Sequence, residues 1–122
     1  MADTPEPVPL TPAMFALLLA LHAGDRHGYA LMDDVARLTD RTMLLGPGTL
    51  YRSLQRLRVE GLVEETDTDD GPAVRADRRA ERRRSYRVTE AGRAAAAAEA
   101  HRLALLLDAA TAAGLLADRN GD

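Results

Sequence analysis

The segment GPGTLYRSLQRLRVEGLVEE, residues 46–65, constrains the fold of this 122-residue chain more than any other stretch. Three of its leucines recur at the spacing of one helical face, namely Leu50, Leu54 and Leu57. This spacing predicts a helix from Pro47 or Gly48 to Glu60 with a buried leucine stripe, since proline is favoured at the first helical position. Gly61 follows where a glycine commonly ends a helix, and the run LVEET has the character of a strand. The segment therefore predicts a helix that packs into a core and turns directly into a strand.

The face of this helix opposite the leucines carries long polar side chains. Arg52, Gln55 and Arg56 lie on that face. In the major groove of DNA, Arg can form two hydrogen bonds with a guanine edge, and Gln can do the same with adenine. A solvated helix surface commonly has the same composition, so the face alone leaves both interpretations open.

The first turn of the helix is suited to an anion. The backbone amides of Gly48 and Thr49 have no partner inside the helix and lie at the positive end of its dipole. We expect them to bind a phosphate, which the flanking glycines let come close to the backbone. Tyr51, on one flank of the helix, is expected to make a flanking or phosphate contact.

The other segments supply the remaining parts of a winged helix-turn-helix domain. Thr11 and Pro12 begin a first helix that is apolar nearly all round and must be covered on more than one side. A second helix is expected from Arg26 or His27 to Leu38. Its buried stripe is expected to comprise Tyr29, Met32, Val35 and Ala36, and its solvated side to include Asp33 and Asp34. The runs LVEET and RRSYRVT would form a hairpin, and Thr89 would cap a long last helix.

The predicted fold class is mainly α with a small β-hairpin. We expect four parts in chain order: a flexible lead at 1–10, a winged helix-turn-helix DNA-binding domain at 11–89, a C-terminal dimerisation helix at 90–117 and a flexible tail at 118–122. The length and the 46% of hydrophobic residues fit one small domain with its own core.

The charges of the chain are distributed unevenly. The formal net charge is -3, yet every basic residue is Arg, and eight of the sixteen lie in residues 75–93. Clustered Arg neutralises phosphates and releases counterions, so we expect the predicted wing to bind the DNA backbone. The arginines assigned to this contact are Arg78, Arg79, Arg82, Arg83 and Arg84.

Two alternatives to a DNA-binding wing remain. One is a solvated charge run, and the other is a winged-helix module that docks on a protein, such as an anti-activator. The acidic residues of segment 64–70 favour the second alternative mildly. An affinity that falls steeply with salt would distinguish DNA binding from protein docking.

The last helix is too long for a domain of this size to cover. About 28 residues span roughly 42 Å, so we expect its far half to need a second chain. The first and last helices of two copies would then pack together in a homodimer, and two-fold symmetry predicts a palindromic operator read by two helices about 34 Å apart. An amphipathic helix folded back on its own domain is the alternative. The residues assigned to the dimer interface are Phe15, Leu18, Ala100, Leu103, Leu106, Leu107 and Ala110.

Several other classes of protein are not favoured. The chain has no cysteine, so it has no disulfide framework and no thiolate nucleophile. The three histidines lack a metal-ligand spacing, and no phosphate-loop or G-x-S-x-G motif occurs, so we expect neither an enzyme nor a metal or other cofactor. The apolar run at 13–23 is too short to span a bilayer, and the expected location is cytoplasmic.

Three blocks of the sequence resemble the PadR-type winged-helix transcriptional regulators: HGYALMDDV, GPGTLYRSLQRLRVEGLVEE and RRRSYRVTEAGR. The resemblance implies a dimeric DNA-binding repressor with its recognition helix at Pro47 to Glu60, a wing between the two strands and a C-terminal helix that dimerises. It also leaves open a small apolar effector bound between the dimer-related helices. The chain has no Trp and one Phe, so it lacks the usual aromatic platform for such a ligand.

Overall fold

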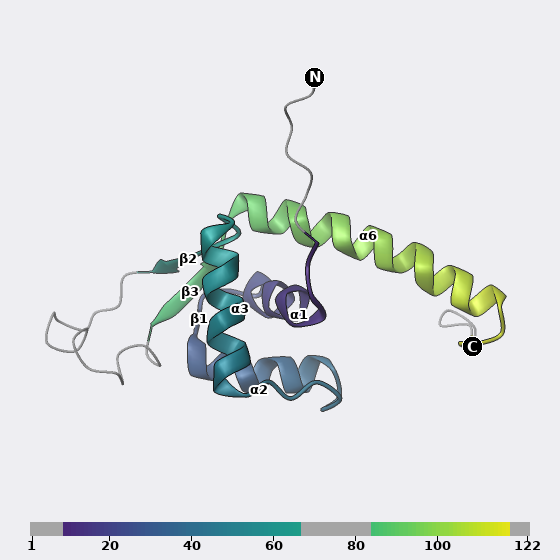
Figure 1. The fold of residues 1–122 in the computed structure, drawn as a ribbon, viewed down its shortest axis with the longest axis horizontal. Helices are drawn as coiled ribbons and strands as arrows, with labels where there is room; N and C mark the ends of the chain where they lie inside the picture. The colour runs from purple at the N-terminus through teal and green to yellow at the C-terminus, as the bar shows by residue number, and fades with distance from the viewer. Residues whose placement is uncertain (1–8, 67–83, 118–122) are drawn as a thin grey trace, which may run out of the picture.

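The computed structural model describes residues 9–66 and 84–117. The first helix lies at the centre, and the other elements pack around it (Figure 1). Thr11 begins α1 (Pro12–His22), because its side-chain oxygen accepts a hydrogen bond from the Met14 amide at 3.1 Å. α1 contacts α2, α3, α6 and β3. The expectation that this apolar helix needs cover from several sides is confirmed, but the cover comes from its own chain. Leu18 is only 1% exposed, so it belongs to the core and not to the dimer surface for which we expected it.

Two further helices form the helix-turn-helix. α2 (Gly28–Leu38) buries Leu31, Val35 and Ala36 against α1 and α3 (Pro47–Val59). The expected burial of Tyr29 is wrong, since its side chain is 52% exposed. The helix begins at Gly28, and Tyr29 in its first turn stacks on His27 outside the core.

The predicted leucine stripe of α3 is confirmed, and the helix ends as its glycine predicts. Leu50, Leu54 and Leu57 are all completely or almost completely buried. Gly61 has a φ of 77°, and the Leu62 amide donates to the Leu57 carbonyl at 2.8 Å. This hydrogen-bond pattern turns the chain sharply out of the helix.

The sheet has one strand more than the predicted hairpin. Its order is β1 (Arg26–His27), β3 (Ser85–Val88), β2 (Val63–Thr66), and both pairings are antiparallel. The second helix therefore starts at Gly28, later than expected, because Arg26 and His27 form β1 and pair with β3. Val63, Tyr86 and Val88 lie on the buried face of the sheet. The loop expected between β2 and β3 lies outside the described residues.

The last helix is α6 (Glu90–Ala112), which begins as expected and ends earlier. Thr89 caps it by accepting from the Gly92 amide at 3.0 Å. Gly114, with a φ of 81°, ends it by the same turn as Gly61, and the Leu115 amide donates to the Ala110 carbonyl. In Figure 1 the first part of α6 passes over α1, and the rest extends away from the other elements.

Candidate nucleic-acid interface

The polar face of α3 is exposed. The side chains of Arg52, Gln55 and Arg56 are exposed, on the side of the helix opposite the three buried leucines. Because the leucines fix the helix in the core, the exposed side chains are presented on a rigid support. The exposure of this face is as the sequence predicted, and its role in reading a DNA groove stays a prediction.

The first turn of α3 is open to a ligand. Gly46 precedes the helix with an ordinary φ of -79° and provides no side-chain cap. A Cβ added at Gly46 would meet nothing within 4 Å, and one at Gly48 would meet only Arg52 Nη1, at 3.8 Å. Neither backbone strain nor packing explains these glycines, and Thr49 beside them is exposed. An anion can therefore come close to the first-turn amides.

Of the two contacts expected of Tyr51, flanking or phosphate, the position of its hydroxyl argues against the second. A Cβ added at Gly28 would lie 3.0 Å from the Tyr51 ring, so the ring packs directly on the backbone at the start of α2. The Tyr51 hydroxyl oxygen is buried. A hydroxyl in this position cannot reach a phosphate, so the expected contact is corrected to a packing contact between α2 and α3.

The base of the wing holds a carboxylate that the sequence did not reveal. Glu65 Oε2 lies 2.9 Å from Arg58 Nη1 and 3.3 Å from Arg84 Nη1. Arg84, a predicted phosphate contact, is thus paired inside the chain. The other assigned wing residues, Arg78, Arg79, Arg82 and Arg83, lie outside the described residues.

Tyr86 lies directly opposite Glu65 in the sheet. Burial raises the pKa of Tyr86 to about 12, and the negative charge of Glu65 adds to the shift. The neutral phenol is therefore the form that the folded protein favours over the whole physiological range.

Two aromatic side chains, His27 and Tyr29, are exposed at the start of α2. The His27 and Tyr29 rings stack with their centroids 5.5 Å apart, and His27 Nδ1 lies 3.2 Å from Ser85 Oγ. Ser85 is the first residue of β3, so the stack lies at the end of the sheet where the wing segment joins.

The far part of α6 exposes large apolar side chains. Leu106 is 54% exposed, and its neighbours Leu105 and Leu107 are exposed as well. Among the other assigned dimer residues, Leu103, Ala110 and Phe15 are half-buried, and Ala100 is exposed. Three consecutive leucines cover about 200° of a helix, which is more than one apolar stripe.

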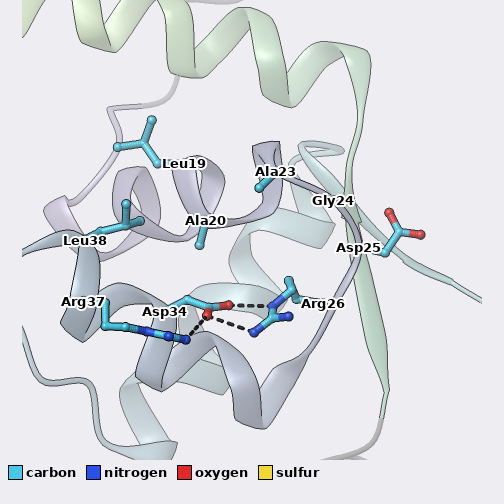
Figure 2. A pocket seen from close by; sticks show the side chains of 9 residues that line it. All are labelled: Leu19, Ala20, Ala23, Gly24, Asp25, Arg26, Asp34, Arg37 and Leu38. Carbon is cyan, nitrogen blue, oxygen red and sulfur yellow. Dashed lines mark hydrogen bonds and ion pairs between the residues drawn. The ribbon is translucent and has the colours of Figure 1, made fainter.

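A groove of about 500 Å³ lies between α1 and α2 (Figure 2). Leu19, Ala20 and Leu38 line its apolar side, and an ion-pair network closes the other. Asp34 accepts from Arg26 Nε at 2.7 Å, from Arg26 Nη2 at 2.9 Å and from Arg37 Nη2 at 3.2 Å. The expectation that Asp34 is solvated is wrong, since its side chain is 15% exposed. The hydrogen bond from Arg26 to Asp34 raises the pKa of Arg26.

Neither a membrane-spanning helix nor a cluster of metal ligands occurs in residues 9–66 and 84–117. Within them, no helix combines the length and the apolar character needed to cross a membrane. The same residues contain no group of three or more His, Asp or Glu side chains that could hold a metal ion.

These elements define a winged helix-turn-helix protein, and comparison with known proteins gives the family. Residues 17–98 match the family described as "Transcriptional regulator PadR-like family". This match covers more than half of the chain, which therefore belongs to the PadR-like family of transcriptional regulators. The family description is that of transcriptional regulators and not of enzymes.

Individual relatives agree with this assignment. The transcriptional regulator Rv3488 of Mycobacterium tuberculosis is 43% identical over 77 residues, which cover 61% of this chain and 61% of that protein. The chain thus spans less than two thirds of its curated relative. A transcriptional regulator from Clostridium thermocellum has a TM-score of 0.65 at 22% identity over 80% of this chain and 84% of its own. A PadR family regulator from Clostridium difficile R20291 has a TM-score of 0.64 at 17% identity over 83% and 96% of the two chains. These two structures are similar in fold.

Proposed function

We propose that this protein is a sequence-specific DNA-binding regulator that acts in the cytoplasm as a dimeric repressor. The observation that carries the proposal is the exposed face of α3, with Arg52, Gln55 and Arg56 opposite three buried leucines. A rigid helix with this face can enter the major groove, where Arg and Gln read guanine and adenine edges.

Contacts to phosphates would fix the position of α3 in the groove. The open first turn at Gly48 and Thr49 offers backbone amides and the positive end of the helix dipole. Arg84 lies at the base of the wing, and the wing arginines of the sequence continue from it. Such contacts carry no sequence information, so base preference would come from α3.

Dimerisation would give the regulator two recognition helices. The exposed leucines of α6 form an apolar surface that a second copy could cover. A two-fold dimer reads a palindromic operator, and its binding across a promoter would block transcription. Leu106→Glu should then convert the dimer to a monomer in sedimentation analysis, whereas Leu19→Glu on α1 should not. A wild-type chain that sediments as a monomer at high concentration would exclude the dimer.

DNA binding is tested by fluorescence anisotropy with the duplex upstream of the gene and an unrelated duplex, each at two salt concentrations. We expect tighter binding to the upstream duplex and an affinity that falls steeply with salt. Gln55→Ala should narrow the difference between the duplexes, because it removes a base contact, while Arg37→Ala at the groove is a control. Salt-insensitive, equally weak binding of both duplexes would exclude DNA binding and favour the protein-docking alternative.

We also propose the groove between α1 and α2 as the site of a small apolar effector. Leu19 and Leu38 line it, and the guanidinium groups of Arg26 and Arg37 have more N–H donors than Asp34 can accept. Anilinonaphthalene sulfonate, an apolar anion, should bind there and gain fluorescence. Ala23→Phe should fill the groove and reduce this signal, and an unchanged signal would count against the site.

A further inference from the structure

Glu65 stands out because it pairs with Arg84, which the proposed function assigns to DNA, and with Arg58 in the last turn of α3. Its Oε2 atom lies 2.9 Å from Arg58 Nη1 on α3 and accepts a hydrogen bond from Arg84 Nη1 at the wing base at 3.3 Å. The three side chains remain accessible, with exposed fractions of 44% for Arg58, 34% for Arg84 and 26% for Glu65. One carboxylate oxygen thus joins the recognition helix to the wing.

A carboxylate and a phosphate compete for the same guanidinium group, since the oxygen atoms of both accept hydrogen bonds from its N–H donors. A phosphate approaching Arg58 or Arg84 would therefore have to displace Glu65 or share the guanidinium with it. The phosphate would also come within a Debye length, about 8 Å, of the negative charge. Either event weakens the contact with every duplex, whatever its sequence.

We propose that Glu65 is an internal competitor for DNA phosphate, which limits the affinity of this protein for DNA of any sequence. The inference rests on the proposed DNA-binding function. As a consequence, the base contacts of α3, which Glu65 does not oppose, make up a larger share of the binding free energy. A regulator limited in this way spends less time on the many non-cognate sites of a genome.

The neighbouring residue Glu64 provides a matched control. It lies on the opposite face of β2, is exposed, and pairs with Arg87 at 3.5 Å. Glu64→Gln and Glu65→Gln change the net charge equally and differ by one position in the chain. A difference between them therefore reports the local contact with Arg58 and Arg84, and not the total charge.

The test is a titration of full-length wild type, Glu64→Gln and Glu65→Gln with an unrelated duplex over a range of salt concentrations. Glu65→Gln should raise the affinity about three- to tenfold and steepen the salt dependence by about one counterion per protomer. Glu64→Gln should change the affinity by less than about twofold. Thermal melts of the three proteins establish that each is folded.

Each other outcome overturns the inference. An equal rise for both variants would mean that total charge alone acts, and a fall for Glu65→Gln would mean that Glu65 orients the arginines for binding. A wild type that binds no duplex would instead refute DNA binding itself, which separates the two failures. As a second check, Glu65→Gln is added to a protein that already carries Arg58→Gln and Arg84→Gln. It should then change the affinity for DNA no more than Glu64→Gln does, because no arginine that pairs with Glu65 is left.

Discussion

Replacing Gly92 with alanine tests the close approach of α6 to the backbone of Leu62. A Cβ at this position would lie 2.1 Å from the Leu62 carbonyl oxygen and 2.8 Å from Val88 Cγ2. Since the first of these atoms belongs to the backbone, no side-chain rotation can relieve the overlap. The start of α6 and the start of β2 would have to move apart by roughly 1 Å before the contact became ordinary.

The expected change in the free energy of unfolding of Gly92→Ala is a balance of opposing effects. Alanine gains about 1 kcal/mol over glycine inside a helix, whereas overpacking of this kind costs about 1–3 kcal/mol. The separation also stretches two hydrogen bonds, from the Thr89 amide to Leu62 and from the Thr89 hydroxyl to Gly61, each with a net value of about 1 kcal/mol. We expect a net loss of about 3 kcal/mol, which lowers the Tm of a domain this size by about 15 °C.

The assay is urea unfolding followed by circular dichroism, with protein concentration held fixed because dimerisation would add to stability. Gly48→Ala is the matched control, since it makes the same change in a helix where the new Cβ meets only a flexible side chain. It should be neutral or stabilise the protein by up to about 1 kcal/mol. Equal urea midpoints for Gly92→Ala and wild type would refute the close approach of α6 to β2.

Three further changes have defined outcomes. Asp40 ends α2 in the left-handed region, with a φ of 52°, so Asp40→Gly should stabilise the fold by about 0.5–1 kcal/mol in thermal melts. Thr89→Ala removes the cap of α6 and should cost about 1–2 kcal/mol in urea unfolding, while Thr89→Ser should retain most of the stability. Because the pKa of Tyr86 is raised from 10.0 to about 12, folding should lose about 2–3 kcal/mol as pH rises from 10 to 12 and none of this below pH 10. The stability of Tyr86→Phe should not show this fall between pH 10 and 12, and a fall that persists in Tyr86→Phe would have another cause.

The elements that could be predicted from the sequence are those that local interactions determine. The cap at Thr11, the leucine stripe of α3 and the glycine turn at Gly61 each depend on residues within one or two helical turns. The polar face of α3 followed from the same periodicity, because the side opposite a buried stripe is exposed.

The features that could not be predicted depend on partners far away in the chain. β1 has two residues, too few to show a period, and it forms a strand because Arg26 pairs with Tyr86, 60 positions further on. Glu65 bridges two arginines only because the sheet register and the end of α3 bring Arg58 and Arg84 together. Tyr29 fitted the helical spacing of a buried stripe, but burial also depends on where the helix begins.

The backbone of Leu62 links α3, the β2–β3 hairpin and α6. Its amide closes the end of α3 through Leu57, its carbonyl accepts from Thr89, and that carbonyl lies against Gly92 in the first turn of α6. Hydrogen bonds and contacts at this residue, together with the packing of both α3 and α6 on α1, therefore hold the angle between α3 and α6. If two copies pair through α6, this junction determines the distance between their α3 helices. An operator with one half-site spacing follows from that rigidity, because a duplex with another spacing could bind both helices only by straining the junction or the DNA.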